Sequence, residues 1–280
     1  MSIKVEDIMV KDVVCATVPG SRDDVLAILK SERVSCVPVV KDGRLVGIVT
    51  RTDLLKHPEE EQLALIMTRD PITISQESDI TDAAKVILVE NIRRLPVVTD
   101  DTLMGLVTVA DLVGAIADMG LKDPIEDLVQ PDLVAVWDET PLPVVMEILR
   151  LSNREASPVL NSKKKLVGII TERDLLGVSE IEDSVEKSDM SAASDEDAWA
   201  WEGMRDTMNL YYGVSRIKLP EVPVKEVMIK DVITAFRRSE ISDCAKKMRR
   251  NRIDQIPVVT AHNKLAGLLL DRDLIRVLTK

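Results

Sequence analysis

Apolar positions along the chain follow first a strand-like and then a helical period, and this succession occurs four times. Each copy begins with a short β-rich stretch and ends with two apolar strands and a polar helix start. In the second copy, Ile80, Ala84, Ile87 and Leu88 recur at helical spacing within a helix expected over residues 78–90. The unit reads β-α-β-β-α, which predicts the α/β (α+β) class.

Fixed spacings define the second half of each copy. A proline opens the first of the last two strands, and a glycine follows 9, 9, 10 and 10 residues later. Six residues after each glycine comes an aspartate: Asp53, Asp111, Asp174 and Asp273. In the first copy we expect strands over 37–40 and 44–50, joined by a turn in which Gly43 supplies a positive φ. Each proline is also preceded by an apolar residue at a distance of 29: Met9, Met67, Val129 and Met228. Ser78 and Ser239 are the expected N-caps of the second and fourth copies.

One such unit is too small to bury its apolar face alone, so we expect two pairs. The prolines are 58, 62 and 99 residues apart, which places an insert between the third and fourth copies. We divide the chain into 1–58, 59–119, 120–178 and 221–280 (repeats 1 to 4), with the insert at 179–220. Residues 180–206 hold ten acidic and two basic side chains. We expect a flexible part over 184–194 and a capped helix with an aromatic face over 195–212, either packed on its own module or docking a partner.

Composition excludes several classes of function. Aromatic residues make up 2% of the chain and the net charge is −11, which argues against binding nucleic acid. No apolar run is long enough for a membrane span, and residues 1–7 lack the long apolar stretch of a signal peptide. Three scattered cysteines suit a reducing compartment, so we expect a cytoplasmic protein. With two histidines and no catalytic constellation, we expect neither an enzyme nor a metal or cofactor site.

Each strand-to-helix junction carries candidate binding groups. Thr50, Thr108 and Thr171 stand three residues before their aspartates, at helix N-termini that favour anions. Such an aspartate either caps its helix or accepts hydrogen bonds from the vicinal hydroxyls of a ribose. Arginines, whose guanidinium groups suit phosphate, lie beside the aspartates or just before the prolines: Arg51, Arg173, Arg272, Arg33, Arg93, Arg94, Arg154 and Arg252.

The pattern Pro-Val-Val…Gly-Ile-Val-Thr-x-x-Asp resembles the CBS domain, and the resemblance covers all of the chain but the insert and short linkers. CBS domains pair into Bateman modules, and four in one chain is a layout similar to the gamma subunit of AMP-activated protein kinase. The resemblance implies two modules in a flat disc, with ligand clefts between paired repeats.

The resemblance also implies a role for individual residues. In the family the aspartate holds the ribose, the threonine lies toward ribose and phosphate, and the partner repeat supplies an apolar cradle for adenine. The Asp53 site would use Thr50, Thr52, Ile72, Ile92, Arg93 and Arg94. The Asp111 site would use Thr108, Val14, Val34 and Arg33. The Asp174 site would use Thr171, Arg173, Ile233, Ile253 and Arg252, and the Asp273 site Arg272, Val134 and the stretch before Pro158.

Two departures single out the fourth cleft. Leu270 replaces the threonine, and Arg154 stands where the other copies have an apolar residue. We therefore expect the Asp273 cleft to be the weakest or empty. In repeat 2, Ala110 cannot reach a phosphate, which favours a nucleoside or a monophosphate at Asp111.

These observations predict a sensor that binds AMP, ADP or ATP and changes the geometry of its modules when the ligand binds. A sensor of S-adenosylmethionine or methylthioadenosine is the alternative within the same clefts. A structural adaptor, with vestigial clefts and a protein partner at the insert, is the alternative from another class. The identity of a partner and the formation of a homodimer are left open by the sequence.

Overall fold

A computed structural model describes the chain except for residues 1–2, 33, 57–59, 179 and 190–208. Repeat 1 consists of α1 (Val5–Ile8), β1 (Ala16–Thr17), α2 (Arg22–Ser31), β2 (Cys36–Lys41), β3 (Arg44–Thr50) and α3 (Arg51–Lys56). Repeat 2 consists of α4 (Leu63–Ile66), β4 (Thr68–Arg69), α5 (Ile80–Val89), β5 (Arg94–Thr99), β6 (Thr102–Thr108) and α6 (Val109–Asp118). Repeat 3 consists of η1 (Glu126–Leu128), β7 (Val136–Trp137), α7 (Leu142–Ser152), β8 (Ala156–Leu160), β9 (Leu166–Thr171) and α8 (Glu172–Gly177). The insert holds β10 (Glu180–Asp189) and β11 (Asn209–Lys218), and repeat 4 consists of η2 (Val224–Glu226), α9 (Ile241–Asn251), β12 (Gln255–Val259), β13 (Leu265–Leu270), α10 (Asp271–Ile275) and η3 (Arg276–Thr279).

The β-α-β-β-α order is confirmed, with short first strands. Strands β2 and β3 form the expected hairpin, and its turn has positive φ at Asp42 (51°) and Gly43 (80°). In repeats 2 and 4 the first strand is reduced to single parallel bridges, Ile74 to Val97 and Ala235 to Val258. The apolar lead-in is therefore present in every copy but is extended chain more than strand.

The expected N-caps were wrong by one residue, because Asp79 and Glu240 cap α5 and α9. The serines before them have another task. The carbonyl of Ser78 accepts a hydrogen bond from the N–H of Val5, and the carbonyl of Ser239 accepts one from the N–H of Ile125. Each serine thus holds the lead-in segment of the repeat that precedes its own.

Repeats pair within a module by exchanging their lead-in segments. In the N-terminal module, β4 of repeat 2 pairs with β3 of repeat 1, while Val10 of repeat 1 bridges to Leu106 in β6. The result is a six-stranded sheet in the order β1-β2-β3-β6-β5, with β4 beside β3. The C-terminal module repeats this exchange, since Ile229 bridges to Ile169 and Gln130 to Leu268.

The glycines of the repeat pattern make this exchange possible. A Cβ placed on Gly47 would lie 2.6 Å from the sulfur of Met67, and one on Gly105 would lie 2.6 Å from the carbonyl oxygen of Val10. Each of the four glycines faces the apolar lead-in residue of its partner repeat: Met67 at Gly47, Met9 at Gly105, Met228 at Gly168 and Val129 at Gly267. The fixed position of the lead-in residue before the proline and that of the glycine after it therefore belong together, because the two residues meet between paired repeats.

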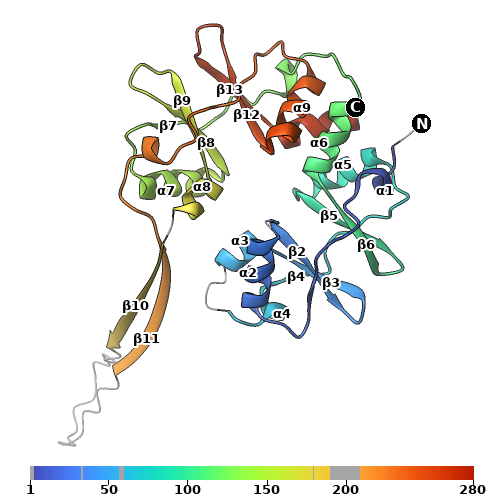
Figure 1. The fold of residues 1–280 in the computed structure, drawn as a ribbon, viewed down its shortest axis with the longest axis vertical. Coiled ribbons are helices and arrows are strands. Elements are labelled where there is room, and N and C mark those ends of the chain that lie inside the picture. Colours follow the sequence, from blue (N-terminus) through green and yellow to red (C-terminus); the bar gives the residue numbers. More distant parts are fainter. Residues whose placement is uncertain (1–2, 33, 57–59, 179, 190–208) are drawn as a thin grey trace, which may run out of the picture.

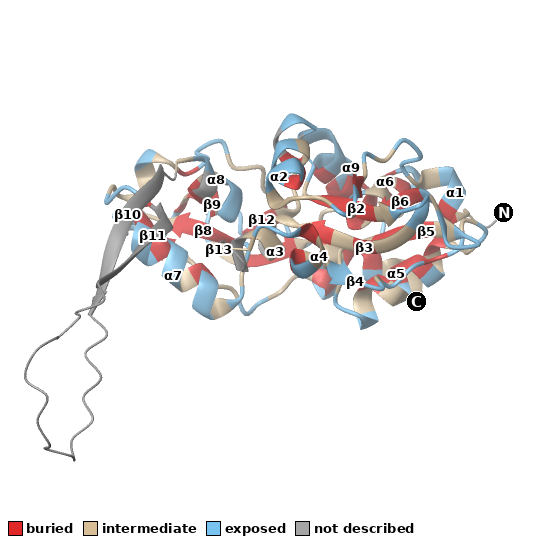
Figure 2. Cartoon of the chain, turned by 90° about the horizontal axis from the view of Figure 1, so that it is seen from below, coloured by how far each residue is buried: buried red, intermediate tan, exposed pale blue. Residues whose placement is uncertain are grey.

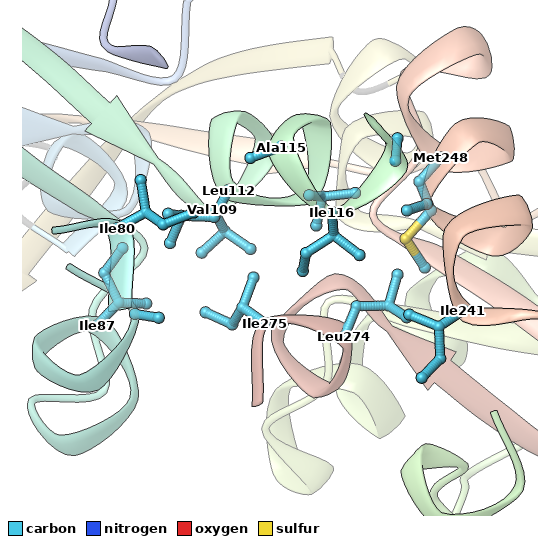
Figure 3. Close-up of a cluster of buried hydrophobic side chains, with 14 of the residues drawn as sticks. Ile80, Ile87, Val109, Leu112, Ala115, Ile116, Ile241, Met248, Leu274 and Ile275 are labelled. Atoms are coloured by element: carbon cyan, nitrogen blue, oxygen red, sulfur yellow. The ribbon is translucent and has the colours of Figure 1, made fainter. Parts of the chain in front are cut away.

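The two modules join through repeats 2 and 4. Their helices share one buried cluster, in which Leu112 and Ile116 of α6 pack near Met248 of α9 and Leu274 of α10 (Figure 3). Full burial of each such side chain contributes about 1.5–3 kcal/mol. Polar contacts add to the interface, because Arg249 donates to both carboxylate oxygens of Asp118, at 2.7 and 2.9 Å.

Repeats 1 and 3 do not share a core. Their buried residues form two separate clusters, and Figure 1 shows α2 and α3 standing apart from α7 and α8. At one helical position repeats 2 and 4 carry Ala84 and Ala245, both fully buried, whereas repeats 1 and 3 carry the exposed Leu26 and Met146. The four repeats lie in one flat layer, as expected for a disc (Figure 2). The disc is closed where repeats 2 and 4 share a core, and it is open between repeats 1 and 3.

The insert was predicted incorrectly where it is described. Residues 184–189, expected to be flexible, belong to β10, and residues 209–212, expected to end a helix, belong to β11. The two strands form an antiparallel ladder from Glu180 opposite Lys218 to Asp189 opposite Asn209. This hairpin extends away from repeat 3 (Figure 1). The rest of the predicted helix, with its tryptophans, lies outside the described residues.

Candidate functional site

In three repeats the threonine and the aspartate of the junction bind each other. The backbone N–H of Thr50 donates to Oδ2 of Asp53 at 2.8 Å, and the Thr50 hydroxyl donates to the same oxygen at 2.7 Å. The distances recur at Thr108 and Asp111 (2.8 and 2.7 Å) and at Thr171 and Asp174 (2.9 and 2.7 Å). The pair forms a capping box, which fixes the start of α3, α6 or α8.

Capping engages one of the two oxygens of each carboxylate. Oδ2 receives both capping bonds, whereas Oδ1 of Asp53, Asp111 and Asp174 accepts no hydrogen bond from the described residues. Burial raises the pKa of Asp111, while the Thr108 hydroxyl and backbone N–H lower it. The cap therefore holds an oriented acceptor at the helix start, and capping and ligand binding are compatible.

The junction of repeat 4 is closed by protein groups. Asp273 is 2% exposed, and its Oδ2 accepts only a long 3.3 Å bond from the N–H of Leu270. Its Oδ1 accepts a hydrogen bond from Nε2 of Gln130 at 2.8 Å and lies 3.5 Å from Arg276. Both oxygens are thus engaged. Gln130, which no motif of the sequence singles out, is one of the two side chains that engage Oδ1 of Asp273.

A small cleft lies beside this junction, and its lining shows which positions of a repeat form the wall of a cleft. It is lined by Gln130, Asp132, Leu133, Val134, Arg154, Ala156, Leu268 and Leu270. Val134 and Arg154 are both part of this lining, and Arg154 donates to the carbonyl of Asp132 at 3.2 Å. The cleft encloses about 10 Å³, which is room for about one water.

The equivalent positions of the other repeats carry apolar side chains that differ in exposure. In repeat 1, which pairs with the repeat of Asp111, Val14 and Val34 are 46% and 37% exposed. In repeat 2, Ile72 is 41% exposed and Ile92 is half-buried. In repeat 4, Ile233 and Ile253 are both half-buried, and the exposed Ile229 stands at the position that Gln130 has in repeat 3. Ile92 and Ile253 also pack against the shared core.

Arg93 is not available to the Asp53 cleft. Arg93 immediately precedes β5 and Arg94 is the first residue of that strand, and the two side chains bond to different repeats. Arg93 donates to both carboxylate oxygens of Asp271 in repeat 4, at 2.6 and 3.3 Å, and lies 3.8 Å from Asp254 and 4.0 Å from Glu155. Burial raises the pKa of Asp271 to about 6 in spite of this arginine. The same carboxylates raise the pKa of Arg93 against the opposing effect of burial.

The other arginines divide between the clefts and the module interface. Arg94 donates to the Ser35 hydroxyl at 2.6 Å, and Arg173 is exposed. Arg272 donates to Asn91 and to the carbonyl of Ile87 in repeat 2, so it serves the interface between modules. Arg252 is exposed and ends α9 with a left-handed φ of 52°. Arg33 and the side chain of Thr52 lie outside the described part of the structure.

Comparisons with known proteins agree with this architecture. Residues 5–60, 62–118, 125–180 and 224–280 each match the family model of the CBS domain. An uncharacterized protein of Methanocaldococcus jannaschii is 26% identical over 264 residues, which are 86% of each chain. Its crystal structure, proposed as an archaeal homologue of γ-AMPK, matches 98% of this chain and 99% of its own with a TM-score of 0.73 and 23% identity. The crystal structure of an uncharacterized conserved protein of Pyrococcus horikoshii matches 99% of this chain and 100% of its own, with a TM-score of 0.70 and 29% identity.

Enzymes are similar to this chain only in part. Inosine-5′-monophosphate dehydrogenase of Korarchaeum cryptofilum is 33% identical over 111 residues, which are 39% of this chain and 23% of the enzyme. Within the described residues no helix could cross a membrane, and no group of three or more metal-binding side chains occurs. The four-repeat architecture is what the chain shares with its full-length relatives.

Proposed function

The chain belongs to the CBS-domain family, and on that premise we propose that it is a regulatory protein that senses adenine nucleotides in the clefts between paired repeats. The ligands are AMP, ADP or ATP. The division of the chain into repeats at 1–58, 59–119, 120–178 and 221–280, with the insert at 179–220, is part of this proposal.

One observation carries the proposal. Three repeats present an aspartate whose Oδ2 is fixed by a threonine and whose Oδ1 is unshared among the described residues, and the paired repeat carries apolar residues at the positions that line the fourth cleft. A ribose supplies two vicinal hydroxyl donors for such an oxygen, and adenine supplies a flat apolar face. The fourth repeat lacks the threonine, and its Asp273 is already bonded to Gln130. We therefore assign ligands to the Asp53, Asp111 and Asp174 clefts and none to the Asp273 cleft.

Calorimetric titration with AMP, ADP and ATP tests this assignment. Asp53→Asn, Asp111→Asn and Asp174→Asn each retain an oxygen for the capping bonds but lose the charge, and each should reduce the number of bound nucleotides by one. Asp273→Asn is the matched control and should leave the number unchanged. Unaltered stoichiometry in all four variants would show that the aspartates do not hold the ligand.

The Asp111 cleft favours a ligand without a long phosphate chain. Ala110 offers no polar side chain there, and Cys36 stands where the Asp53 cleft has Arg94. S-adenosylmethionine and methylthioadenosine, titrated beside adenosine and AMP, identify the class. Binding of the sulfur compounds in preference to AMP in every cleft would replace the nucleotide assignment with the S-adenosylmethionine alternative.

The hairpin β10–β11 favours a second candidate, an adaptor role, because it extends beyond the four repeats as a surface of its own (Figure 1). The two functions differ in one measurement. A panel of adenosyl compounds should raise the melting temperature of a sensor and leave that of an adaptor with vestigial clefts unchanged.

A further inference from the structure

The two aromatic residues outside the insert occupy the same position of a repeat. Trp137 and Phe236 each stand 21 residues before the proline of their repeat, at the end of the lead-in strand or extended segment. Their side chains are 53% and 55% exposed, and among the described residues the buried core contains no aromatic side chain. Aromatic residues are enriched where protein surfaces bind each other, so their use on the surface alone indicates a docking role.

The same position is polar in the N-terminal module. It carries Thr17 in repeat 1 and Ser75 in repeat 2, and both residues are exposed. The repeat architecture therefore needs no ring at this position. The rings of Trp137 and Phe236 serve a contact that is particular to the C-terminal module.

Trp137 lies beside a turn that presents three lysines. It is paired with Leu160, the last residue of β8, and the turn to β9 follows directly. Lys163, Lys164 and Lys165 are exposed in this turn, and none of them forms an ion pair with a described residue. The ring is thus placed next to a concentrated positive charge.

Phe236 is also placed among cations. The exposed Arg237 and Arg238 follow it directly in the chain. Arg237 donates to the carbonyl of Ala266 in β13 at 3.2 Å, which ties this segment to the hairpin whose turn carries Lys264. Each ring of the C-terminal module therefore has a basic hairpin turn as its neighbour.

We call this surface the aromatic rim, and it consists of the two rings and six cations: Trp137, Phe236, Lys163, Lys164, Lys165, Arg237, Arg238 and Lys264. The turns β8–β9 and β12–β13 project from one side of the C-terminal module (Figure 1). Of the six cations, only Arg237 lies near a described acid, 3.8 Å from Glu126. The matching turn of repeat 2 carries Asp100 and Asp101 instead. In a chain of net charge −11, such a local excess of cations attracts an acidic surface.

The hairpin β10–β11 is an acidic surface of this same chain. Strand β10 carries five acidic residues and one lysine in ten positions. Glu180 and Glu182 stand opposite basic residues of β11, whereas Asp183, Glu186 and Asp189 stand opposite uncharged ones. The outer part of the hairpin therefore carries the negative charge that the ladder itself does not balance.

The hairpin also lacks a supporting layer. Strands β10 and β11 pair with each other and with no other described strand. A two-stranded sheet alone is marginally stable in water and gains stability when it packs on another surface. Figure 1 shows the hairpin leaving the C-terminal module on the side opposite to the turns of the aromatic rim, so a chain directs its hairpin away from its own rim.

We propose that the aromatic rim is the docking surface for the β10–β11 hairpin of a second copy of this chain. The acidic positions of the hairpin face the cations of the rim, and the two rings supply the apolar contact. Each copy has one hairpin and one rim, so two copies satisfy both surfaces in a closed dimer. The contact is independent of the proposed function and forms without nucleotide.

Sedimentation equilibrium of the full chain without nucleotide tests the charge contact. The wild type should form a dimer whose dissociation constant rises with salt concentration. Lys163→Glu with Lys165→Glu should raise this constant about tenfold or more. Lys41→Glu with Arg44→Glu makes the same charge change at the matching turn of repeat 1 and should dimerise as the wild type does. A wild type that stays monomeric, or an equal loss in this control, would overturn the proposal.

The two rings are tested in the same experiment. Trp137→Ala with Phe236→Ala should weaken the dimer about tenfold or more, because large aromatic side chains dominate the energy of protein interfaces. Thr17→Ala with Ser75→Ala changes the same position in the N-terminal module and should leave the dissociation constant unchanged. Equal dissociation constants in both double variants would show that the rings do not take part.

A charge exchange identifies the occupant. Glu186→Lys with Asp189→Lys reverses the hairpin and should also prevent self-association. Mixed with the Lys163→Glu and Lys165→Glu variant, it should form a mixed dimer, since one contact is then reversed in sign and the other is that of the wild type. Unchanged melting temperatures show that both variants are folded. Absence of the mixed dimer would mean that the rim receives its own hairpin or another protein, and would overturn the proposal.

Discussion

Arg93 and Asp271 are joined by two hydrogen bonds, of 2.6 and 3.3 Å, across the interface of the two modules, with the Asp271 side chain 4% exposed. A sequence separation of 178 residues lies between them. The pair sits beside the shared core of repeats 2 and 4, so its chemistry bears directly on how the modules are held.

Arg93→Gln should destabilise the protein by about 3 kcal/mol, because it leaves the buried carboxylate of Asp271 without its main partner. The double variant Arg93→Met with Asp271→Met should cost less than the single one, because no buried charge remains unpaired. Urea denaturation at pH 7.5 measures both. A loss below about 0.5 kcal/mol for the single variant, the range of an exposed pair, would contradict this view.

The stability of the wild type should depend on pH through Asp271. Burial raises the pKa of this group to about 6, so the folded state binds its proton more tightly than the unfolded state does. The resulting stabilisation is complete below about pH 4 and is lost as the pH rises through 6, a difference on the order of 3 kcal/mol. Asp271→Asn lacks this pH-dependent stabilisation. The unfolding free energy of the variant should therefore rise relative to that of the wild type between pH 4.5 and 7. Parallel profiles in urea denaturation at four pH values would exclude the effect.

Gly168→Ala should cost about 1–3 kcal/mol, because the new Cβ would overlap the side chain of Met228 from the partner repeat. Truncation of Met228 to Ala in the same chain should recover part of the loss, giving a favourable coupling in a double-mutant cycle. Gly177→Ala is the control, since nothing lies within 4 Å of a Cβ at that position. Additive losses for the two single changes would mean that Gly168 and Met228 do not constrain each other.

The fourth cleft should become a binding site when its aspartate is released. Leu270→Thr restores the hydroxyl for the cap, and Gln130→Ala frees Oδ1 of Asp273, so the double variant should bind one more nucleotide than the wild type. Leu270→Thr alone should not, because Gln130 still donates to Asp273. Calorimetric stoichiometry gives the answer, and an unchanged number in the double variant would refute the view that Gln130 and Leu270 keep this cleft closed.

The regular spacings predicted most of the fold. Proline, glycine and aspartate at fixed intervals located the hairpins and the helix starts, and the resemblance to the CBS domain is confirmed along with the pairing into modules. The capping boxes could also be anticipated, because Thr-x-x-Asp is a local pattern whose partners are three residues apart.

Long-range choices could not be read from the sequence. The apolar helices of all four repeats suit a bundle, and the choice of repeat 2 with repeat 4 depends on the small Ala84 and Ala245 and on contacts such as Arg249 with Asp118. The sequence assigns Arg93 to a phosphate because its true partner, Asp271, lies far along the chain. The insert escapes prediction because the ladder of β10 and β11 is formed by backbone groups, which leave no regular side-chain period in an acidic sequence.

The common core of repeats 2 and 4 also sets the order of events while the chain is being made. Helix α6 is complete at Asp118, but α9 begins only at Ile241. At ribosomal rates of about 5–20 residues per second, α9 is synthesised on the order of ten seconds after α6, and the apolar face of α6 has no contact with α9 during that time. Until α9 and α10 have been made, the side of α6 that carries Leu112 and Ile116 lacks the helices of repeat 4 that complete its core.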